Sequence, residues 1–567
     1  MRIVLVNWAR IWDGATLGGG VNGYCQALAL ELARRGHDVI SLCGGNAYTA
    51  VDPRACRVEI RRHADWMGLR VFEVVNSPVL APSICQFGDP LAEASSPELE
   101  RVVAAFFSRI KPEVVHFHNI EGFSAGCVAS AKAAGAGVVF SLHNYHTICP
   151  QVYLMRGHRR ACYSYDDGHA CEGCIESPSL DQTRRDRVEL TLRGDAPAAA
   201  SRADALVRQA PPRGRWSLGT LLDSLSTPSS RPTPAALGSP TDADADLTRP
   251  IPPPNADERG KTRYLHGELT PRVWPGPHDP EWQPLDNDPV GEPLSTAAPG
   301  PYAQRRSAML AMLASCDRVL AVSEFVRRKF AAMGVPERVL RTVPIGTRIG
   351  EVADRHKELV FAPPPIDPAS PRPLRLLFIG YNHWYKGLPM LADSLELLTP
   401  DYLSRIHLFV YALGGESIEW RFRRLEPRLA ALTIHHGYEY HDIPWMCGGK
   451  DYGLVPSVWW DNAPQTVFEY LGCGLPVIGA NLGGIPDFVH DGVNGLLFRG
   501  NDRYALAQTL ARTIREPGLA VKLRDGVRPP RSVGDHALEM EQIYHGCVPS
   551  RSGEALSGGQ TGSRSRS

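Results

Sequence analysis

The chain has 567 residues, and its 61 Lys and Arg residues balance its 61 Asp and Glu residues. At roughly 100–200 residues per domain, this length predicts two or three domains. The balanced charge provides no net field to attract nucleic acid or an anionic membrane, so no nucleic-acid partner is expected. An anionic ligand would have to be bound by local residues and helix ends.

The sequence carries no apolar run of the ~18 residues that a membrane-spanning helix needs. The first residues, MRIVLVNWARIW, lack the length and the small-residue cleavage site of a signal peptide, and they predict a first strand instead. We therefore expect a cytoplasmic protein. Peripheral association with the inner membrane face is compatible with the same sequence.

The N-terminal region has the pattern of a doubly wound α/β domain. Residues 2–7 predict a buried parallel strand, and Gly18-Gly19-Gly20 predicts a Gly-rich turn after it. Apolar residues at helical spacing then predict a helix from Tyr24 to Arg35. Further strands are expected at residues 38–43, 114–117 and 138–142. Strand, Gly-rich turn, helix and strand are typical of a Rossmann-like fold, which we assign to residues 1–177.

Residues 178–300 differ in composition from the rest of the chain. Pro, Ser, Asp, Arg and Ala dominate, and there is little apolar periodicity. Such a segment cannot bury enough apolar surface to offset the entropy of ordering. We expect a largely disordered insertion here. Residues 301–360 are expected to complete the first domain, with a helix over 324–333 for which Ser323 is the N-cap.

A second α/β pattern follows a Pro-rich connector at residues 362–373. It predicts a second Rossmann-like domain over residues 370–530. Its expected strands are 374–379, 406–411, 432–436, 452–455 and 476–479, and its expected helices include 388–398 and 464–472. The low-complexity residues 548–567 are expected to form a disordered tail.

Two acids of the second domain, Asp461 and Glu469, lie eight positions apart. Pro464 stands between them, and proline suits the first turn of a helix. A helix that begins there directs free backbone N–H groups and its positive dipole end towards Asp461, where a pyrophosphate would fit. Glu469 lies further along the helix, where a carboxylate can hold a diol such as a ribose. Two acids in a strand–proline–helix unit are also common without any such site.

The whole segment 456–498, PSVWWDNAPQTVFEYLGCGLPVIGANLGGIPDFVHDGVNGLLF, resembles the donor-binding signature of retaining, family-4-like GT-B glycosyltransferases. That signature has a carboxylate, seven residues and a Glu, then Gly-x-Pro-Val-Ile, Gly-Gly-x-Pro and an acidic-Gly-x-x-Gly turn. Glu469 and residues 474–478, 483–486 and 491–495 match it. Asp461 stands where the family more often has Glu, and its carboxylate reaches one methylene less far.

The resemblance implies that Asp461 contacts the donor sugar and that Glu469 binds the ribose. It also places six further residues against the donor. They are Asn462, Pro464, Gln465, Thr466, Gly483 and Gly484.

A second stretch, Gly380-Tyr381-Asn382-His383-Trp384-Tyr385-Lys386-Gly387, follows an expected strand and precedes an expected helix. A lysine there can act as a point charge on a diphosphate, and a solvated surface lysine is the alternative. The stretch resembles the family's phosphate-binding loop, in which an Arg and a Lys neutralise the leaving group. Lys386 matches the Lys. Tyr381 takes the place of the Arg, so one positive charge is missing, and Gly380 and Tyr381 are expected beside the donor.

In the N-terminal half, Gly19 and Gly20 resemble the glycine loop by which the family approaches the acceptor or the donor phosphate. A plain tight turn has the same composition. His143, in Ser-Leu-His-Asn, matches the His of a common His-Asp pair in the family, with Asn144 in place of the Asp. The resemblance places His143 near the transferred sugar, among the catalytic residues.

His116 and His118 also end or follow an expected strand, at the edge where ligands bind open α/β sheets. A structural role fits their positions at least as well.

Four cysteines cluster in the sequence: Cys149, Cys162, Cys171 and Cys174. A C-x-x-C pair with two more thiols is the composition of a four-thiolate zinc site, which can fold a segment without a core. Relatives of this transferase group carry a similar insertion. Structural zinc, unligated thiols and a disulfide or redox pair are three open interpretations, and in each the cluster is structural rather than catalytic.

The resemblance implies the GT-B fold, two Rossmann-like domains that face a cleft, with a last helix within 531–547 that crosses back to the first domain. It implies transfer of a sugar from a nucleotide-diphosphate sugar to a hydroxyl of a glycan or lipid-linked acceptor, with retained anomeric configuration. Synthesis of cell-envelope polysaccharide or glycolipid is the expected context.

The resemblance also implies that no catalytic cofactor or metal is needed, and no Asp-x-Asp motif lies near the donor segment. Lys386 and the helix N-terminus at Pro464 would instead stabilise the leaving diphosphate. Two alternatives remain open. One is a GT-B sugar-nucleotide epimerase, although the acids that such enzymes need in the cleft are not found in the sequence. The other is an inactive relative that acts as a binding protein, which Asp461 and Tyr381 favour.

Overall fold

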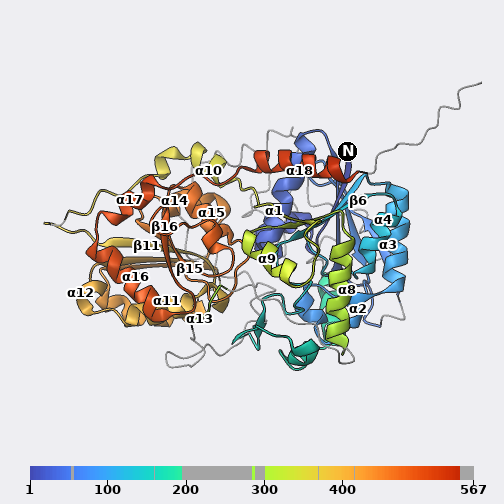
Figure 1. The fold of residues 1–567 in the computed structure, drawn as a ribbon, viewed down its shortest axis with the longest axis horizontal. Helices are drawn as coiled ribbons and strands as arrows, with labels where there is room; N and C mark the ends of the chain where they lie inside the picture. Colours follow the sequence, from blue (N-terminus) through green and yellow to red (C-terminus); the bar gives the residue numbers. More distant parts are fainter. Residues whose placement is uncertain are drawn as a thin grey trace, which may run out of the picture.

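The computed structural model describes residues 1–52, 56–158, 160–193, 284–287, 300–367, 369–413 and 416–548. These residues form two α/β halves, each built around its own sheet (Figure 1). The predicted fold class, two Rossmann-like domains, is confirmed.

In the described part of the chain, the first sheet has eight strands in the order β10-β9-β6-β5-β1-β2-β4-β3. All neighbours are parallel except β3 and β4. The central strands are apolar runs that are buried almost throughout, as expected for a sheet covered on both faces. The strands are β1 (Arg2–Val6), β2 (Asp38–Ala47), β3 (Glu59–Arg62), β4 (Arg70–Val75), β5 (Val114–Phe117), β6 (Gly137–Leu142), β9 (Arg318–Ala321) and β10 (Leu340–Thr342).

The second sheet, again counted over the described residues, has six parallel strands in the order β13-β12-β11-β14-β15-β16. The order reverses between β11 and β14. In open α/β sheets, ligands bind beyond the carboxyl ends of the strands at such a switch point. The strands are β11 (Leu374–Tyr381), β12 (Ile406–Leu413), β13 (Ala431–His435), β14 (Tyr452–Val455), β15 (Val477–Asn481) and β16 (Gly495–Arg499).

Helices flank both sheets (Figure 1). In the first half they include α1 (Gly14–Arg34), α3 (Pro97–Ile110), α4 (Gly126–Ala133), α8 (Pro301–Ser315) and α9 (Glu324–Ala332). In the second half they include α11 (Leu388–Glu396), α13 (Glu416–Leu425), α15 (Gln465–Gly472), α16 (Arg503–Arg515) and α17 (Leu519–Asp525), and α10 (Ile349–Arg355) precedes its sheet. The hydroxyl of Ser323 accepts a hydrogen bond from the backbone N–H of Val326, so it caps α9 as predicted.

The Gly-rich stretch differs from its prediction. Gly18-Gly19-Gly20 lies inside α1 and not in a turn before it. Gly19 alone leaves the helical conformation, with φ 69° and ψ −177°, a region that only glycine adopts readily. The stretch therefore interrupts a helix that begins ten residues earlier than the predicted Tyr24.

The last helix, α18 (Val533–Cys547), returns to the first half (Figure 1). The hydroxyl of Tyr24 lies 2.7 Å from Nε2 of His536. Glu541 accepts hydrogen bonds from the guanidinium of Arg35. At the far end, a Cβ on Gly137 would lie 2.6 Å from the carbonyl oxygen of Cys547, so the helix packs directly on β6.

The two halves also meet at α9. The carboxylate of Asp487, in the second half, accepts from the backbone N–H of Glu324 at 2.6 Å. The ammonium of Lys329 lies 5.6 Å from the ring centre of Trp460. The carboxylate of Asp487 lies at the first turn of α9, where a negative charge is favourable, so its contact joins the two halves electrostatically.

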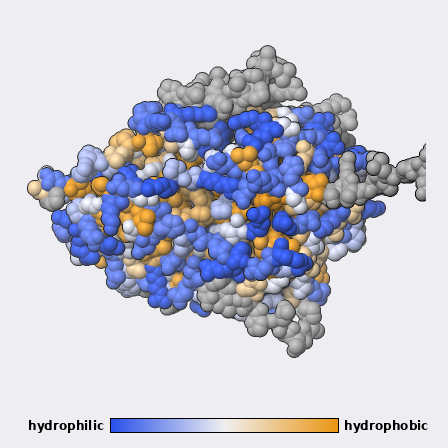
Figure 2. All heavy atoms as spheres, turned by 45° about the horizontal axis from the view of Figure 1, so that its top comes forward, coloured by the Kyte–Doolittle hydropathy of each residue, from blue (hydrophilic) through white to orange (hydrophobic). Residues whose placement is uncertain are grey.

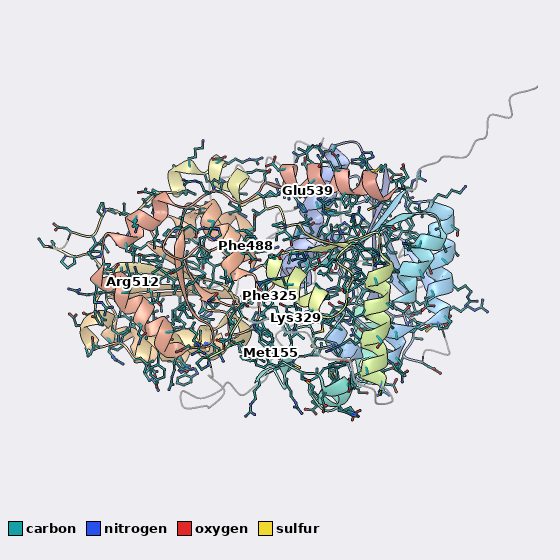
Figure 3. All side chains as sticks on the ribbon, viewed as in Figure 1. Met155, Phe325, Lys329, Phe488, Arg512 and Glu539 are labelled. Atoms are coloured by element: carbon teal, nitrogen blue, oxygen red, sulfur yellow. The ribbon has the colours of Figure 1, made fainter. Side chains whose placement is uncertain are left out.

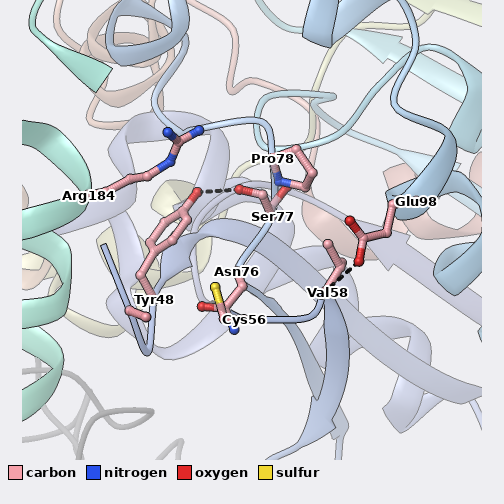
Figure 4. Close-up of a pocket in the computed structure, with 9 residues that line it drawn as sticks. Tyr48, Cys56, Val58, Asn76, Ser77, Pro78, Glu98 and Arg184 are labelled. Atoms are coloured by element: carbon pink, nitrogen blue, oxygen red, sulfur yellow. Dashed lines mark hydrogen bonds between the residues drawn. The ribbon is translucent and has the colours of Figure 1, made fainter. Parts of the chain in front are cut away.

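The segment expected as an insertion begins with a helix, α5 (Leu180–Arg193). Arg187 is buried and donates to the carbonyl oxygen of Ala81 at 3.0 Å, so α5 packs on the first half. A small pocket beside α5 is lined by residues that include Tyr48, Glu98 and Arg184 (Figure 4). Residues 194–283 and 288–299, on which the prediction of disorder mainly falls, and residues 549–567 of the predicted tail lie outside the described residues.

Hydrophilic residues cover most of the face shown in Figure 2, with apolar atoms scattered between them. Among the described residues, no helix combines the length and the apolar character that crossing a membrane requires.

Candidate functional site

Lys386 and Asp461 form an ion pair at the switch point of the second sheet. Nζ of Lys386 lies 2.8 Å from Oδ2 of Asp461. Lys386 closely follows β11 and Asp461 follows β14, and these two strands are neighbours. The Asp461 side chain is only 7% exposed, and the Lys386 side chain is 30% exposed. A charged pair therefore lies where ligands bind in this class of sheet.

Glycine brings the two loops of this pair together. Gly387 has φ 79°, and a Cβ there would lie 1.7 Å from the carbonyl oxygen of Pro456. The backbone N–H of Val458 donates to the carbonyl oxygen of Tyr385 at 3.0 Å. The loop that carries Lys386 and the chain before Asp461 are therefore joined through their backbones.

Gly483 and Gly484 pack against the backbone of Asp461. The N–H of Gly484 donates to the carbonyl oxygen of Asp461 at 2.7 Å. A Cβ on Gly483, whose φ is 57°, would lie 2.0 Å from the same oxygen. The N–H of Gly483 donates to Asn287 at 2.7 Å. This close backbone approach accounts for both glycines, and their predicted contact with a donor stays a prediction.

Glu469 lies in the second turn of α15, with its side chain buried. Burial raises the pKa of the Glu469 carboxyl to about 7, although nearby Lys386 lowers it. Within the described chain, its Oε2 has no hydrogen-bond partner. A buried oxygen without a partner carries a desolvation cost, which a hydroxyl donor from a ligand would offset.

The start of α15 differs by one residue from its prediction. Pro464 is the N-cap, with ψ 124°, and the helix begins at Gln465. Thr466 lies in the first turn and is half-buried. The side-chain amide of Gln465 donates to the carbonyl oxygen of Gly20 at 2.7 Å, which brings the predicted glycine loop against the predicted donor helix.

Asn462 is 3% exposed, and neither its Oδ1 nor its Nδ2 has a hydrogen-bond partner among the described residues. Like Oε2 of Glu469, it is a buried polar group near Lys386 and Asp461 that the surrounding protein leaves unsatisfied. Such groups in a native structure need an explanation, and a ligand supplies one.

Gly380 and Tyr381 are the last two residues of β11, where they pair with Ala412 and Leu413 of β12. Tyr381 is half-buried. The structure therefore puts a neutral ring at the strand end where the resembled family has an Arg.

His143 follows β6 within a group of histidine and tyrosine rings. Its Nε2 lies 3.3 Å from Nδ1 of His118, and its ring centre lies 4.8 Å from that of Tyr24. Burial lowers the pKa of His143 to about 3, so its imidazole is neutral at pH 7. These contacts lie within the first half, and the place of His143 near a transferred sugar stays a prediction.

His116 is held from two sides, by the hydroxyl of Tyr544 at 2.7 Å and by the hydroxyl of Ser141 at 2.8 Å. Both ring nitrogens are therefore used within the protein. This arrangement supports the structural interpretation of His116.

The four clustered cysteines are all described, and none of them is part of a disulfide. The thiol of Cys162 donates to the carbonyl oxygen of Ser164 at 3.3 Å, and the sulfur of Cys174 accepts from the N–H of Gly157 at 3.4 Å. Cys149 and Cys171 are buried. Within the described ranges, no group of three or more His, Cys, Asp or Glu side chains could hold a metal ion. The side chains thus do not fit a zinc site as arranged, and structural zinc stays a prediction.

Other residues complete the site without having been singled out from the sequence. The hydroxyl of Tyr145 donates to the carbonyl oxygen of Trp460 at 2.8 Å, beside Asp461. Tyr385 stands next to Lys386 within the stretch already selected, so its position was a usable signal. Asn287 lies in a segment whose composition predicts disorder, and nothing local marks it.

Two protein-family models match the chain. Residues 19–174 match the glycosyl transferase 4-like domain, and residues 373–516 match the model described as glycosyl transferases group 1. The first range contains Gly19, Gly20 and His143. The second contains Lys386, Asp461 and Glu469.

Curated relatives match over parts of the chain. The D-inositol 3-phosphate glycosyltransferase of Thermobifida fusca is 47% identical over 161 residues, which cover 25% of this chain and 35% of that protein. The putative colanic acid biosynthesis glycosyltransferase WcaL of Escherichia coli is 27% identical over 204 residues, 34% of this chain and 47% of that protein. The chain thus spans less than half the length of these relatives.

Among solved structures, the sucrose-phosphate synthase from Thermosynechococcus elongatus superposes with a TM-score of 0.51 at 14% identity. The superposition covers 96% of this chain and 98% of that one. The likeness extends over both halves and concerns the fold.

Proposed function

Because the chain belongs to the glycosyltransferases of the GT-B fold, we propose that it transfers a sugar from a nucleotide-diphosphate sugar to a hydroxyl acceptor, with retention of anomeric configuration. One observation carries the proposal. The Lys386–Asp461 pair lies at the switch point of the second sheet, within electrostatic range of a buried Glu469 whose Oε2 is unpartnered.

In this reaction the bond between the anomeric carbon and a diphosphate oxygen breaks, and its electron pair leaves with the diphosphate. A bond forms between the same carbon and the acceptor oxygen, and the acceptor hydroxyl passes its proton to the departing diphosphate oxygen. Negative charge therefore grows on the leaving diphosphate. The ammonium of Lys386 and the free N–H groups at the start of α15 stabilise that charge electrostatically.

Asp461 has two successive roles in the proposal. Before the donor binds, its carboxylate holds Lys386 at 2.8 Å. With the donor bound, the diphosphate takes over Lys386, and the carboxylate accepts a hydroxyl of the donor sugar.

Glu469 binds the ribose diol. Its free Oε2 supplies an acceptor for one hydroxyl, and a pKa of about 7 means that the empty site holds the carboxyl partly protonated at neutral pH. The unpartnered side-chain amide of Asn462 offers two N–H donors and one oxygen acceptor to the same ligand. Pro464, Gln465, Thr466, Gly380, Tyr381, Gly483 and Gly484 complete the proposed donor site.

The acceptor enters from the first half, past Gly19, Gly20 and His143. We take a glycan or lipid-linked hydroxyl as the acceptor class, in cell-envelope polysaccharide or glycolipid synthesis. The name of one relative, a putative colanic acid biosynthesis glycosyltransferase, supports this choice, whereas the other relative is named for D-inositol 3-phosphate, a small-molecule acceptor. The proposed location is the cytoplasm or the inner membrane face.

The proposal uses no catalytic metal or cofactor, because Lys386 and the helix N-terminus supply the positive charge. Structural zinc at Cys149, Cys162, Cys171 and Cys174 remains a separate prediction. Metal analysis of the purified protein tests it, and less than one equivalent of zinc would contradict it.

The test of function is a screen of the purified chain against UDP-, GDP- and ADP-sugars, with release of nucleoside diphosphate as the readout. Glu469→Ala should reduce donor binding, and Lys522→Ala, an exposed lysine of α17, is the matched surface control. If no donor binds or turns over, and Glu469→Ala changes nothing, the transferase proposal is wrong.

A second candidate is a binding protein that retains the site without the chemistry. The observation in its favour is the charge balance at the switch point, where Asp461 already neutralises Lys386 and Tyr381 adds no charge. Saturable nucleotide binding without turnover of any sugar donor would select this candidate.

A further inference from the structure

An arm of the first half, residues 145–158, reaches the loop that carries Lys386. The ring of Tyr153 lies 4.2 Å from that of Tyr385 and 5.0 Å from that of Trp459. Tyr145, at the start of the arm, is completely buried and bonds to the backbone of Trp460. Met155, also in the arm, lies between the two halves in Figure 3. The arm therefore packs on both loops of the Lys386–Asp461 pair.

The arm ends on a hydrogen bond between Nδ1 of His158 and the hydroxyl of Tyr385. The direction of this bond follows from Gln151. The side-chain oxygen of Gln151 accepts from the N–H of Met155, so its nitrogen is the group that faces His158 Nδ1, at 3.1 Å. An amide nitrogen only donates, and Nδ1 is therefore an acceptor. Burial lowers the pKa of His158 to about 4, which keeps the ring neutral at pH 7 and lets Tyr385 donate to it.

Tyr385 in turn restricts the position of Lys386, the residue that follows it. It is 1% exposed, its ring lies 4.2 Å from that of His383, and its carbonyl oxygen accepts from Val458. Gly387 is packed against Pro456 on the other side of Lys386. The stem of Lys386 thus leaves a backbone that is held at both neighbours, and its ammonium lies 6.0 Å from the ring centre of Trp459.

We propose that His158 and Tyr385 are positioning residues for Lys386. The arm of the first half holds the hydroxyl of Tyr385, and this contact aligns the Lys386 ammonium with the leaving diphosphate. The inference rests on the proposed function and adds His158 and Tyr385 to the residues of the same site. The first half then contributes to stabilising the leaving group without touching it.

The test compares Tyr385→Phe, His158→Ala, His158→Asn and the double variant Tyr385→Phe/His158→Ala. The substrate is whichever of UDP-glucose, ADP-glucose and GDP-mannose the unaltered protein turns over fastest. Tyr385→Phe keeps the ring and removes only the hydroxyl. His158→Asn keeps an acceptor, and asparagine tolerates the φ of 57° at this position better than alanine does. Tyr504→Phe and His545→Ala make the same chemical changes at exposed positions.

Tyr385→Phe and His158→Ala should each lower kcat about tenfold, because a misplaced charge stabilises the transition state less. The donor KM should stay within about twofold, as expected for an interaction that matters mainly in the transition state. The double variant should be no slower than either single variant, because both remove one shared contact. His158→Asn should recover most of the lost kcat, and the two exposed variants should match the unaltered protein.

The outcomes separate the two proposals. If the unaltered protein turns over a donor and Tyr385→Phe keeps its kcat, the positioning role is overturned and the transferase stands. Losses that multiply in the double variant would also overturn it, since the residues would then act independently. If the unaltered protein turns over no donor, the proposed function fails and this inference fails with it. Should His158→Ala not fold, Tyr385→Phe and His158→Asn decide the question.

Discussion

The side-chain amide of Gln465, in the second half, donates to the backbone carbonyl of Gly20, in the first half, over 2.7 Å. Gly20 follows the interruption of α1 at Gly19, and Gln465 is the first residue of α15. The break in one helix therefore faces the start of the other. In the proposed enzyme, the first half closes over the helix N-terminus that receives the diphosphate.

Gly20→Ala should weaken this contact. The added Cβ would lie 3.1–3.3 Å from the side-chain amide of Gln465, which is tighter than ordinary contact, so the amide must shift. One hydrogen bond contributes about 1 kcal/mol, and we expect kcat/KM to fall about fivefold. Gly350→Ala is the matched control, because a Cβ at Gly350 meets no atom within 4 Å. An unchanged kcat/KM in Gly20→Ala would show that the contact does not matter for turnover.

Lys386→Ala should lower kcat by about two orders of magnitude, as expected when one preorganised positive group is removed from a developing charge. It should also lower the melting temperature, because the Asp461 carboxylate, 7% exposed, loses its partner. Steady-state kinetics and thermal unfolding measure the two effects. A variant with normal kcat would exclude Lys386 from the reaction.

Glu469 should make the protein less stable as the pH rises. Burial raises its pKa from 4.5 to about 7, so the folded state binds more protons than the unfolded state between these values. The free energy of unfolding should therefore fall from pH 4.5 to about pH 7, by on the order of 3 kcal/mol at most. Glu469→Gln removes this titration. Urea unfolding at pH 5 and pH 8 should show the variant gaining stability relative to the unaltered protein at the higher pH, and parallel curves would contradict the raised pKa.

The buried histidines His143 and His536 should act in the opposite sense. Burial lowers the pKa of His143 and of His536 from 6.5 to about 3. Their contribution to stability is complete above pH 6.5 and is lost as the pH falls towards 3, because the unfolded chain takes up the protons first. His536→Gln should reduce the acid-induced loss in melting temperature between pH 7 and pH 4, while His545→Ala, exposed on the same helix, should not. An equal acid loss in His536→Gln would contradict the lowered pKa.

The sequence predicts most of the central strands of both sheets, although the buried strands β4 and β16 were not predicted. Runs such as residues 2–7 and 374–379 are continuously apolar, so their pattern needs no tertiary context. β3, with the sequence EIRR, lies at a sheet edge and carries no apolar signature, and it went unpredicted. Helix α5 went unpredicted as well, because its average composition is strongly polar and only a few of its residues, such as Arg187, are buried.

The site residues can be divided in the same way, into those that a local sequence pattern predicts and those whose contacts depend on the packing of the fold. Asp461 and Glu469 belong to one local motif, and the family resemblance places Lys386 in another. The ion pair between Lys386 and Asp461 joins positions 75 residues apart, which no local pattern specifies. The contact of His158 with Tyr385 depends on how the two halves are packed, and this is set by surfaces far apart in the sequence.

The return of α18 to the first half limits how the two halves can move. The second half is tied to its neighbour at both of its ends, once before β11 and once before α18. A domain that is connected at two points moves most easily by rotation about the line that joins those points. A change in the angle between the halves would thus be a rotation about the line through the two connections, and it would alter contacts between the halves such as that of Gln465 with Gly20.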